Sequence, residues 1–180
     1  MSEKKKAVFL DRDGVINKEV SYLSNPRDFK FIKGSIKALK IIKKKSFLLI
    51  VITNQAGIAR GFFTEKTLNT IHEKMIRRLK EGGVDLDDIY YCPHHPKFTG
   101  PCDCRKPNPG MILKAKLKYN IDLTKSYMVG DTLNDIQTGK AAKCKTVLVL
   151  TGYGKAEKKK IGSIVPDMIF KNLKEFAINI

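Results

Sequence analysis

Short apolar runs alternate along the chain with segments in which apolar residues recur every three or four positions. Ala7–Leu10 and Phe47–Ile52 are unbroken apolar runs, typical of strands buried on both faces. Between them, Ser35–Lys45 carries isoleucine and leucine on one side and lysine on the other, which predicts an amphipathic helix. The same pattern predicts further strands at Asp88–Cys92, Ser126–Val129, Thr146–Leu150 and Met168–Phe170, and further helices at 65–81, Pro109–Tyr119, Asp135–Ala142 and Leu173–Ile178.

Alternating strands and helices predict an α/β fold in which helices cover both faces of a parallel sheet. Residues 1–180 show no linker, repeat or low-complexity stretch, so we expect one domain. Three irregular segments remain, Asn17–Lys33, Pro93–Asn108 and Gly152–Pro166. Ligands of parallel sheets bind at the carboxyl ends of strands, and the first two of these segments follow such ends.

Composition and charge narrow the class of protein. No segment is apolar over the roughly 18 residues that a membrane helix needs, and the basic run Lys4–Lys6 precedes too few apolar residues for a signal peptide. We therefore expect a cytoplasmic protein without membrane partners. The net charge of +17 fits a solvated lysine-rich surface, binding of nucleic acid, or attraction of anionic small substrates. We expect the first; nucleic acid is not the expected partner.

Carboxylates follow two of the predicted strands directly. Asp11 and Asp13 stand in the segment Asp11-Arg12-Asp13-Gly14 after the first strand, and Asp131 follows the strand that ends near Gly130, with Asp135 one helical turn later. A single aspartate at a strand end is usually a turn or cap residue. Two such sites on neighbouring strands form an oxygen-rich group suited to Mg²⁺.

Groups suited to phosphate accompany these carboxylates. Thr53 and Asn54 follow the second strand, where a hydroxyl, an amide and backbone N–H groups can hold phosphate oxygens. Lys106 stands in Arg105-Lys106-Pro107 and offers a positive charge. Each of these signals is weak alone; together with the carboxylates they indicate phosphoryl chemistry.

In this order and at these strand ends, the residues resemble the four motifs of the haloacid dehalogenase superfamily. The resemblance covers nearly the whole chain and implies a Rossmann-like three-layer sandwich whose first strand is central, flanked by the second and fourth. It implies that Asp11 attacks phosphorus, that Asp13 is the general acid and base, and that Thr53 and Lys106 stabilise the phosphoryl group. It also implies that Asp11, Asp131 and the Asp13 backbone carbonyl hold Mg²⁺, and that Asp135 orients Lys106 or the water around the metal.

Three of the four cysteines lie close together in the loop 92–104. Cys92, His94, Cys102 and Cys104 form the pattern Cys-x-His, seven residues, Cys-x-Cys, which predicts a closed, structural Zn²⁺ site. His95 is the alternative to His94. Because proline and glycine recur in this loop, we expect no regular structure in it without zinc. Since Arg105 and Lys106 follow Cys104, zinc would fix two cations at the site.

The zinc loop resembles that of the heptose bisphosphate and histidinol phosphate phosphatases, and the segments after the first two strands look closest to the heptose group. This resemblance implies removal of the 7-phosphate of D-glycero-D-manno-heptose 1,7-bisphosphate, in the pathway to lipopolysaccharide or surface heptose. It places Glu19–Tyr22, Thr53, Asn54, Gln55, Ala56 and Arg105 around the sugar phosphate. The chain lacks room for a separate cap domain, so loops must shape specificity.

Three other functions remain open from the sequence. They are a histidinol-phosphate phosphatase, a nucleic-acid 3′-phosphatase and a zinc-stabilised nucleic-acid-binding module. The last leaves Asp11, Asp13 and Asp131 unexplained, since converging carboxylates repel phosphate without a metal. We expect a monomer that acts on a small phosphorylated sugar. His72, beside the apolar stripe of its helix, is interpreted as structural.

Overall fold

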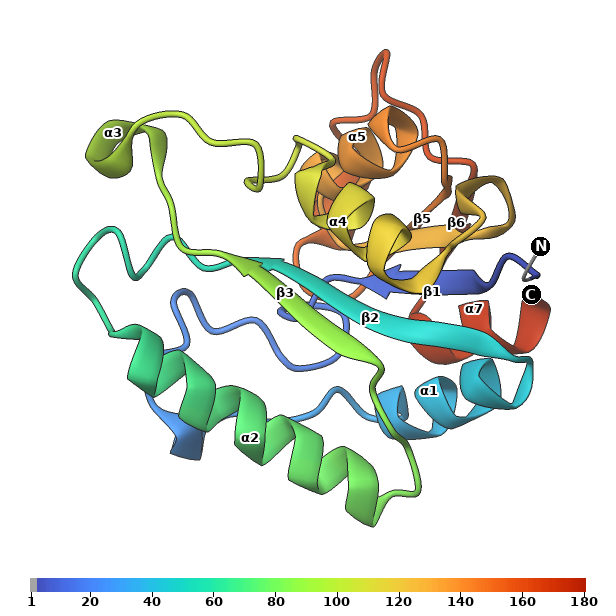
Figure 1. Ribbon diagram of the computed structural model, residues 1–180, viewed down its shortest axis with the longest axis horizontal. Helices are drawn as coiled ribbons and strands as arrows, with labels where there is room; N and C mark the ends of the chain where they lie inside the picture. The colour runs from blue at the N-terminus through green and yellow to red at the C-terminus, as the bar shows by residue number, and fades with distance from the viewer. Residues whose placement is uncertain (1–2) are drawn as a thin grey trace.

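The computed structural model describes residues 3–180 (Figure 1). Its strands are β1 (Lys6–Leu10), β2 (Phe47–Asn54), β3 (Asp88–Cys92), β4 (Tyr127–Gly130), β5 (Lys145–Val149) and β6 (Met168–Phe170). Its α-helices are α1 (Ser35–Lys44), α2 (Glu65–Glu81), α3 (Pro96–Thr99), α4 (Gly110–Tyr119), α5 (Leu133–Ala141), α6 (Gly154–Lys158) and α7 (Leu173–Asn179). Two 3₁₀ turns are η1 (Pro26–Asp28) and η2 (Leu123–Lys125).

All six strands pair in parallel in one sheet, in the order β3-β2-β1-β4-β5-β6. The predicted α/β class and the central place of the first strand are therefore confirmed. Alternate residues of each strand enter two apolar layers: Val8 and Leu10 pack with α1, α2 and α7, while Ala7 and Phe9 pack with α4. Figure 1 shows α1, α2 and α7 on one side of the sheet and α4 and α5 on the other.

Most predicted elements are confirmed to within two residues of their ends, with three corrections. The segment Pro93–Asn108 is not wholly irregular, because the short helix α3 forms at Pro96–Thr99; a proline at the first position of a helix costs no hydrogen bond. Gly152–Pro166 likewise contains α6. Helix α5 starts two residues earlier than predicted, since the backbone N–H of Thr132 donates to the Asp135 carboxylate at 3.1 Å and so anchors its first turn.

The register of the central strands brings the predicted site residues to one edge of the sheet. Leu10 of β1 is level with Val51 of β2 and Val129 of β4, so the residues that follow all three leave the sheet together. The backbone N–H of Asp11 donates to the Val129 carbonyl at 2.9 Å and extends this pairing by one residue. Within residues 3–180, no helix combines the length and apolar character needed to cross a bilayer.

Candidate active site

A buried ion-pair network lies at the carboxyl ends of β1, β2 and β4. The Lys106 ammonium donates to Asp11 Oδ1 at 2.8 Å, to Asp135 Oδ1 at 2.6 Å and to the Ile52 carbonyl at 3.1 Å. Lys106 is 3% exposed, and both carboxylates stay mostly shielded from water. Although burial opposes its charge, the two carboxylates raise the pKa of Lys106, so it carries a full positive charge. The predicted meeting of Asp11, Lys106 and Asp135 is therefore present in the structure.

The loop that carries Lys106 is tied to the end of β2. Asn54 Oδ1 accepts from the Lys106 backbone N–H at 3.0 Å, and Asn54 Nδ2 donates to the Lys106 carbonyl at 3.1 Å. This paired bond fixes the lysine backbone against the strand. Asn54 thus positions Lys106, a contact that the sequence alone did not suggest.

Asp131 is enclosed by two glycines. Its Oδ2 accepts from the Tyr153 backbone N–H at 2.8 Å, and a Cβ at either Gly14 or Gly152 would lie 2.0 Å from that oxygen. The Thr151 hydroxyl donates to the Gly14 carbonyl at 2.6 Å and joins the two glycine segments. The segment 151–153 was missed from the sequence, although Gly152-Tyr153-Gly154 directly after an apolar strand is a signal for close backbone approach.

The carboxylates of Asp11, Asp131 and Asp135 lie within 4.8 Å of one another, a spacing that suits a hard cation. Burial raises the pKa of Asp11 to about 7, because the attraction of Lys106 only partly opposes it and neighbouring carboxylates add to it. Burial and then repulsion from Asp11 and Asp135 raise the pKa of Asp131 to about 9. Lys106 alone does not balance this charge. The donor set therefore fits Mg²⁺, which would keep both carboxylates ionised.

The Asp13 carboxylate is bound by side chains outside this group. Arg12 Nη2 donates to its Oδ2 at 2.8 Å, Asn17 Nδ2 to its Oδ1 at 2.8 Å and Gln55 Nε2 to its Oδ2 at 3.1 Å. Burial raises the pKa of Asp13, but Arg12 and these amides outweigh it, so the net pKa lies below the usual value. Only the backbone carbonyl of Asp13 was predicted to bind metal, and that role stays a prediction.

One pocket of about 300 Å³ opens above the network. Of the residues predicted to contact substrate, all but Val20 of the range Glu19–Tyr22 line it, namely Glu19, Ser21, Tyr22, Thr53, Asn54, Gln55, Ala56, Arg105 and Lys106. Asp11 and Asp13 are at its base. Tyr153, Thr132 and Asn134 also line the pocket and were not predicted to do so. Thr132 and Asn134 stand between the motif residues Asp131 and Asp135, where spacing alone does not show which side chains face a pocket.

Arg60 joins three loops, one of which carries the pocket residue Tyr22. Its guanidinium lies 5.6 Å from the Tyr22 ring and 5.4 Å from the Phe98 ring, and Nη2 lies 3.0 Å from His95 Nε2. Tyr22 also packs edge-on against Phe62 at 4.9 Å between centroids. The loops after β1, β2 and β3 are thus held together by cation–π and aromatic contacts. None of these contacts was expected from the sequence.

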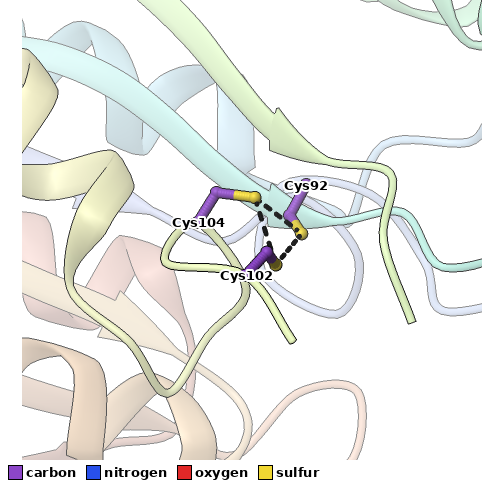
Figure 2. Close-up of side chains that lie close together, drawn as sticks. All are labelled: Cys92, Cys102 and Cys104. Carbon is purple, nitrogen blue, oxygen red and sulfur yellow. Dashed lines mark hydrogen bonds between the residues drawn. The ribbon is translucent and has the colours of Figure 1, made fainter. Parts of the chain in front are cut away.

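Figure 2 shows the thiols of Cys92, Cys102 and Cys104 converging where β3 ends and the following loop returns. The Sγ–Sγ distances are 3.0 Å for Cys92–Cys104, 3.4 Å for Cys102–Cys104 and 3.6 Å for Cys92–Cys102, and all three cysteines are free. Such a cluster of thiols suits Zn²⁺. Among residues 3–180, these three cysteines and the carboxylates above form the groups with metal-ligand spacing.

The structure does not bring the predicted fourth ligand into the thiol group. His94 follows in the same loop, and its carbonyl accepts from Arg105 Nη1 at 3.1 Å, but its ring does not belong to the cluster. The alternative, His95, contacts Arg60 instead. The loop contacts fix the backbone of His94, but its ring can rotate about two side-chain bonds. The rotamer in this structure therefore does not determine the position of the ring when a metal is bound. Its role as a ligand stays a prediction.

Comparison with known proteins places this geometry in a family. The HAD-hydrolase-like family model matches residues 103–176. The D-glycero-beta-D-manno-heptose-1,7-bisphosphate 7-phosphatase of Pasteurella multocida (strain Pm70) is 52% identical over 153 residues, which are 82% of this chain and 83% of that protein. The enzyme of the same name from Escherichia coli (strain K12) is 51% identical over 158 residues, 84% of this chain and 83% of its own.

A solved structure agrees in the backbone. The D,D-heptose 1,7-bisphosphate phosphatase from B. bronchiseptica, complexed with magnesium and phosphate, superposes with a TM-score of 0.90 at 36% identity and covers 97% of each chain. The predicted resemblance is therefore confirmed over nearly the full length. The chain belongs to the D-glycero-beta-D-manno-heptose-1,7-bisphosphate 7-phosphatase family of haloacid dehalogenase-like hydrolases.

Proposed function

We propose that this protein is a Mg²⁺-dependent phosphatase that removes the 7-phosphate of D-glycero-β-D-manno-heptose 1,7-bisphosphate through an aspartyl-phosphate on Asp11. The observation that carries the proposal is the buried group of Asp11, Asp131 and Asp135 with Lys106 at the base of the pocket. A phosphate ester would meet a carboxylate nucleophile and a fixed ammonium there. The choice of heptose and of its β anomer as substrate is based on the names of the family members that the chain resembles.

Asp11, Asp131 and the Asp13 backbone carbonyl would hold Mg²⁺. When bound, the ion supplies positive charge that keeps the carboxylates ionised and offsets their repulsion of phosphate. Asp11 then attacks phosphorus through one oxygen, and the bond from phosphorus to the sugar oxygen breaks. Lys106 and Thr53 stabilise the charge on the transferring group.

Asp13 would manage the protons of both half-reactions. The negative charge of the bound substrate phosphate would oppose ionisation of Asp13 and raise its pKa from the low value of the free site. In the acid form it would donate a proton to the departing sugar oxygen, and as a carboxylate it would then accept a proton from the water that attacks the phosphoenzyme. Inorganic phosphate leaves, and Asp11 returns to a free carboxylate. The net reaction consumes one water and releases one heptose 1-phosphate and one inorganic phosphate.

Loops of different origin would select the sugar. Arg105, Glu19 and Tyr22 line the pocket from the zinc loop and from the loop after β1. Arg105 can grip the phosphate that does not react, because a guanidinium binds phosphate oxygens in pairs. Zn²⁺ held by Cys92, His94, Cys102 and Cys104 would give the zinc loop a defined shape. We propose that the enzyme acts as a cytoplasmic monomer, which light scattering of the purified protein would test.

A phosphate-release screen tests this function. The panel contains both anomers of the heptose 1,7-bisphosphate, histidinol phosphate and a 3′-phosphorylated oligonucleotide, each with and without Mg²⁺. We expect the highest kcat/KM for the β-heptose bisphosphate and no release without Mg²⁺. Preference for histidinol phosphate or for the oligonucleotide would replace the proposed substrate, and Mg²⁺-independent release would remove the proposed mechanism.

A further inference from the structure

A fully buried arginine links the acid–base carboxylate to helix α2. Arg12 stands between Asp11 and Asp13 in the chain and is 0% exposed. Its Nη2 and Nε reach the Asp13 carboxylate at 2.8 and 3.3 Å, while its Nη1 lies 3.1 Å from His72 Nε2. One planar guanidinium therefore touches both side chains.

The direction of the Arg12–His72 bond is fixed by chemistry. A guanidinium offers only donors, so His72 Nε2 must be the acceptor, and its ring must be neutral. His72 is 6% exposed on the buried side of α2. Burial, helped by the charge of Arg12, lowers its pKa to about 3, which agrees with a neutral ring.

This contact orients the guanidinium. If the planar guanidinium of Arg12 bound Asp13 alone, it could still tilt about that contact. His72 Nε2, as a second acceptor on the opposite side, fixes the plane of the guanidinium. Asp13 must present one oxygen to the leaving sugar oxygen and later to water, so its orientation bears on proton transfer. Metal binding and phosphate binding involve other side chains.

We propose that His72 is a positioning residue for the acid–base step: by accepting from Arg12 it holds the guanidinium that orients Asp13. The proposal rests on the proposed function. A purely structural His72 would instead support packing of α2, where its ring lies 6.0 Å from that of Tyr91. The two roles differ in which kinetic quantity changes when the acceptor is removed.

The test uses two substitutions at one position and a packing control. His72→Gln keeps an acceptor that can reach Arg12, whereas His72→Leu removes it at similar size. Met75→Leu perturbs the same buried stripe of α2 at a fully buried position and is the control. For heptose bisphosphate we expect kcat to fall about 10-fold in His72→Leu, a fraction of the 10²–10⁴ attributed to general acid–base catalysis. His72→Gln should stay within about 3-fold, with KM and the Mg²⁺ half-saturation unchanged in both.

The leaving group provides a second readout. An aryl phosphate such as 4-nitrophenyl phosphate departs as a stable phenolate and needs little protonation, so its kcat should fall less in His72→Leu than that of the sugar phosphate. Thermal melts and the Met75→Leu control separate loss of fold from loss of chemistry.

Three outcomes would overturn the role of His72: unchanged kcat in His72→Leu, equal losses in the Leu and Gln variants, or a loss that appears in KM or Mg²⁺ affinity. If the wild-type protein hydrolyses none of these esters, the proposed function itself fails and this role fails with it.

Discussion

The floor and the rim of the pocket are built in different ways. We define the floor as the residues at the strand ends and the lysine between them: Asp11, Thr53, Lys106, Asp131 and Asp135. We define the rim as the pocket-lining loop residues Glu19, Tyr22 and Arg105 together with Arg60 and Phe98, which connect to the pocket through Tyr22. Each floor residue is at most 9% exposed, whereas Tyr22 and Phe98 are 44% and 56% exposed. The floor is held by strand pairing and buried ion pairs; the rim is held by side chains that reach from one loop to another.

This contrast separates chemistry from selection. Strand register fixes the floor within a rigid sheet, as phosphoryl transfer requires of its charged groups. The rim depends on a few exposed contacts between loops. Substitutions there can therefore change the substrate preference of the enzyme without disturbing the floor. Damage to the floor should therefore lower kcat or metal affinity, and damage to the rim should change KM first.

The largest effect is expected from Asp11→Asn. An amide cannot attack phosphorus as a carboxylate does, so we expect kcat to fall by roughly 10³-fold or more. Phosphate release under saturating substrate measures this, and mass spectrometry of the acid-quenched wild-type enzyme should find one phosphoryl group. Asp85→Asn, an exposed aspartate beyond α2, is the matched control and should keep full activity. Full activity in Asp11→Asn would falsify the nucleophile assignment.

Gly152→Ala should cause the next largest effect, because its Cβ would meet Asp131 Oδ2 at 2.0 Å. The backbone there also has a φ of +52°, which disfavours side chains. We expect the Mg²⁺ needed for half-maximal activity to rise by about 10- to 100-fold, the usual cost of disturbing support for a metal ligand.

Gly162→Ala is the control for Gly152→Ala, since nothing lies within 4 Å of a Cβ built at that position. Magnesium titrations of both variants measure the effect. An unchanged half-saturation in Gly152→Ala would show that Asp131 tolerates displacement, and the floor would be less rigid than we infer.

The floor could be predicted from the sequence because each of its parts has a local signal. An apolar run that ends at Asp11 or at Asp131 marks a strand end, and parallel pairing brings strand ends together whatever the loops do. The cysteine spacing likewise marked the thiol cluster, since metal sites need several ligands close in the chain.

The rim could not be predicted because its contacts join loops that are distant in the sequence. Nothing around Arg60 indicates that its guanidinium lies between Tyr22 and Phe98, residues 38 positions away on either side in the chain. The same holds for His72, whose helical stripe indicated only packing. The fourth ligand of the predicted zinc site stayed open because His94 and His95 are adjacent, and spacing alone does not choose between them.

Loss of zinc should affect the rim more than the floor. We expect Cys102→Ser to lose bound zinc and to lower kcat/KM for heptose bisphosphate by about 10-fold, since outer elements of a site commonly contribute 10- to 100-fold. The Mg²⁺ half-saturation should not change. Elemental analysis and steady-state kinetics measure both quantities.

Cys144→Ala is the matched control for Cys102→Ser, because Cys144 is also a free cysteine but lies outside the thiol cluster. It should retain zinc and activity. If Cys102→Ser lost zinc with kinetics unchanged, the zinc loop would have no part in selecting the substrate.

Arg60→Met should act on the rim more mildly. It removes the cation–π contacts to Tyr22 and Phe98 while keeping an unbranched side chain, and such exposed contacts contribute about 0.5–1 kcal/mol each. We expect KM for heptose bisphosphate to rise by roughly 3- to 10-fold, with kcat within 2-fold. Arg77→Met, an exposed arginine on α2, is the control. A fall in kcat without a change in KM would contradict the division between floor and rim.

The smallest effect concerns His72, which contacts Arg12, and it is measured as a change in the free energy of unfolding. Because the folded pKa of His72 is lowered from 6.5 to about 3, the unfolded chain binds more protons between these values, and stability falls as pH decreases through that window. This contribution is essentially complete at about pH 8, well above the unfolded pKa of 6.5, and about 0.8 kcal/mol of it should be lost by pH 6. His72→Gln lacks the titrating ring, so its free energy of unfolding should fall by that much less between pH 8 and pH 6. Urea unfolding of both proteins in magnesium-free buffer measures the difference, in which all other groups cancel. Equal slopes would mean that His72 can be protonated in the folded protein, and Arg12 would then lack the fixed acceptor that orients Asp13.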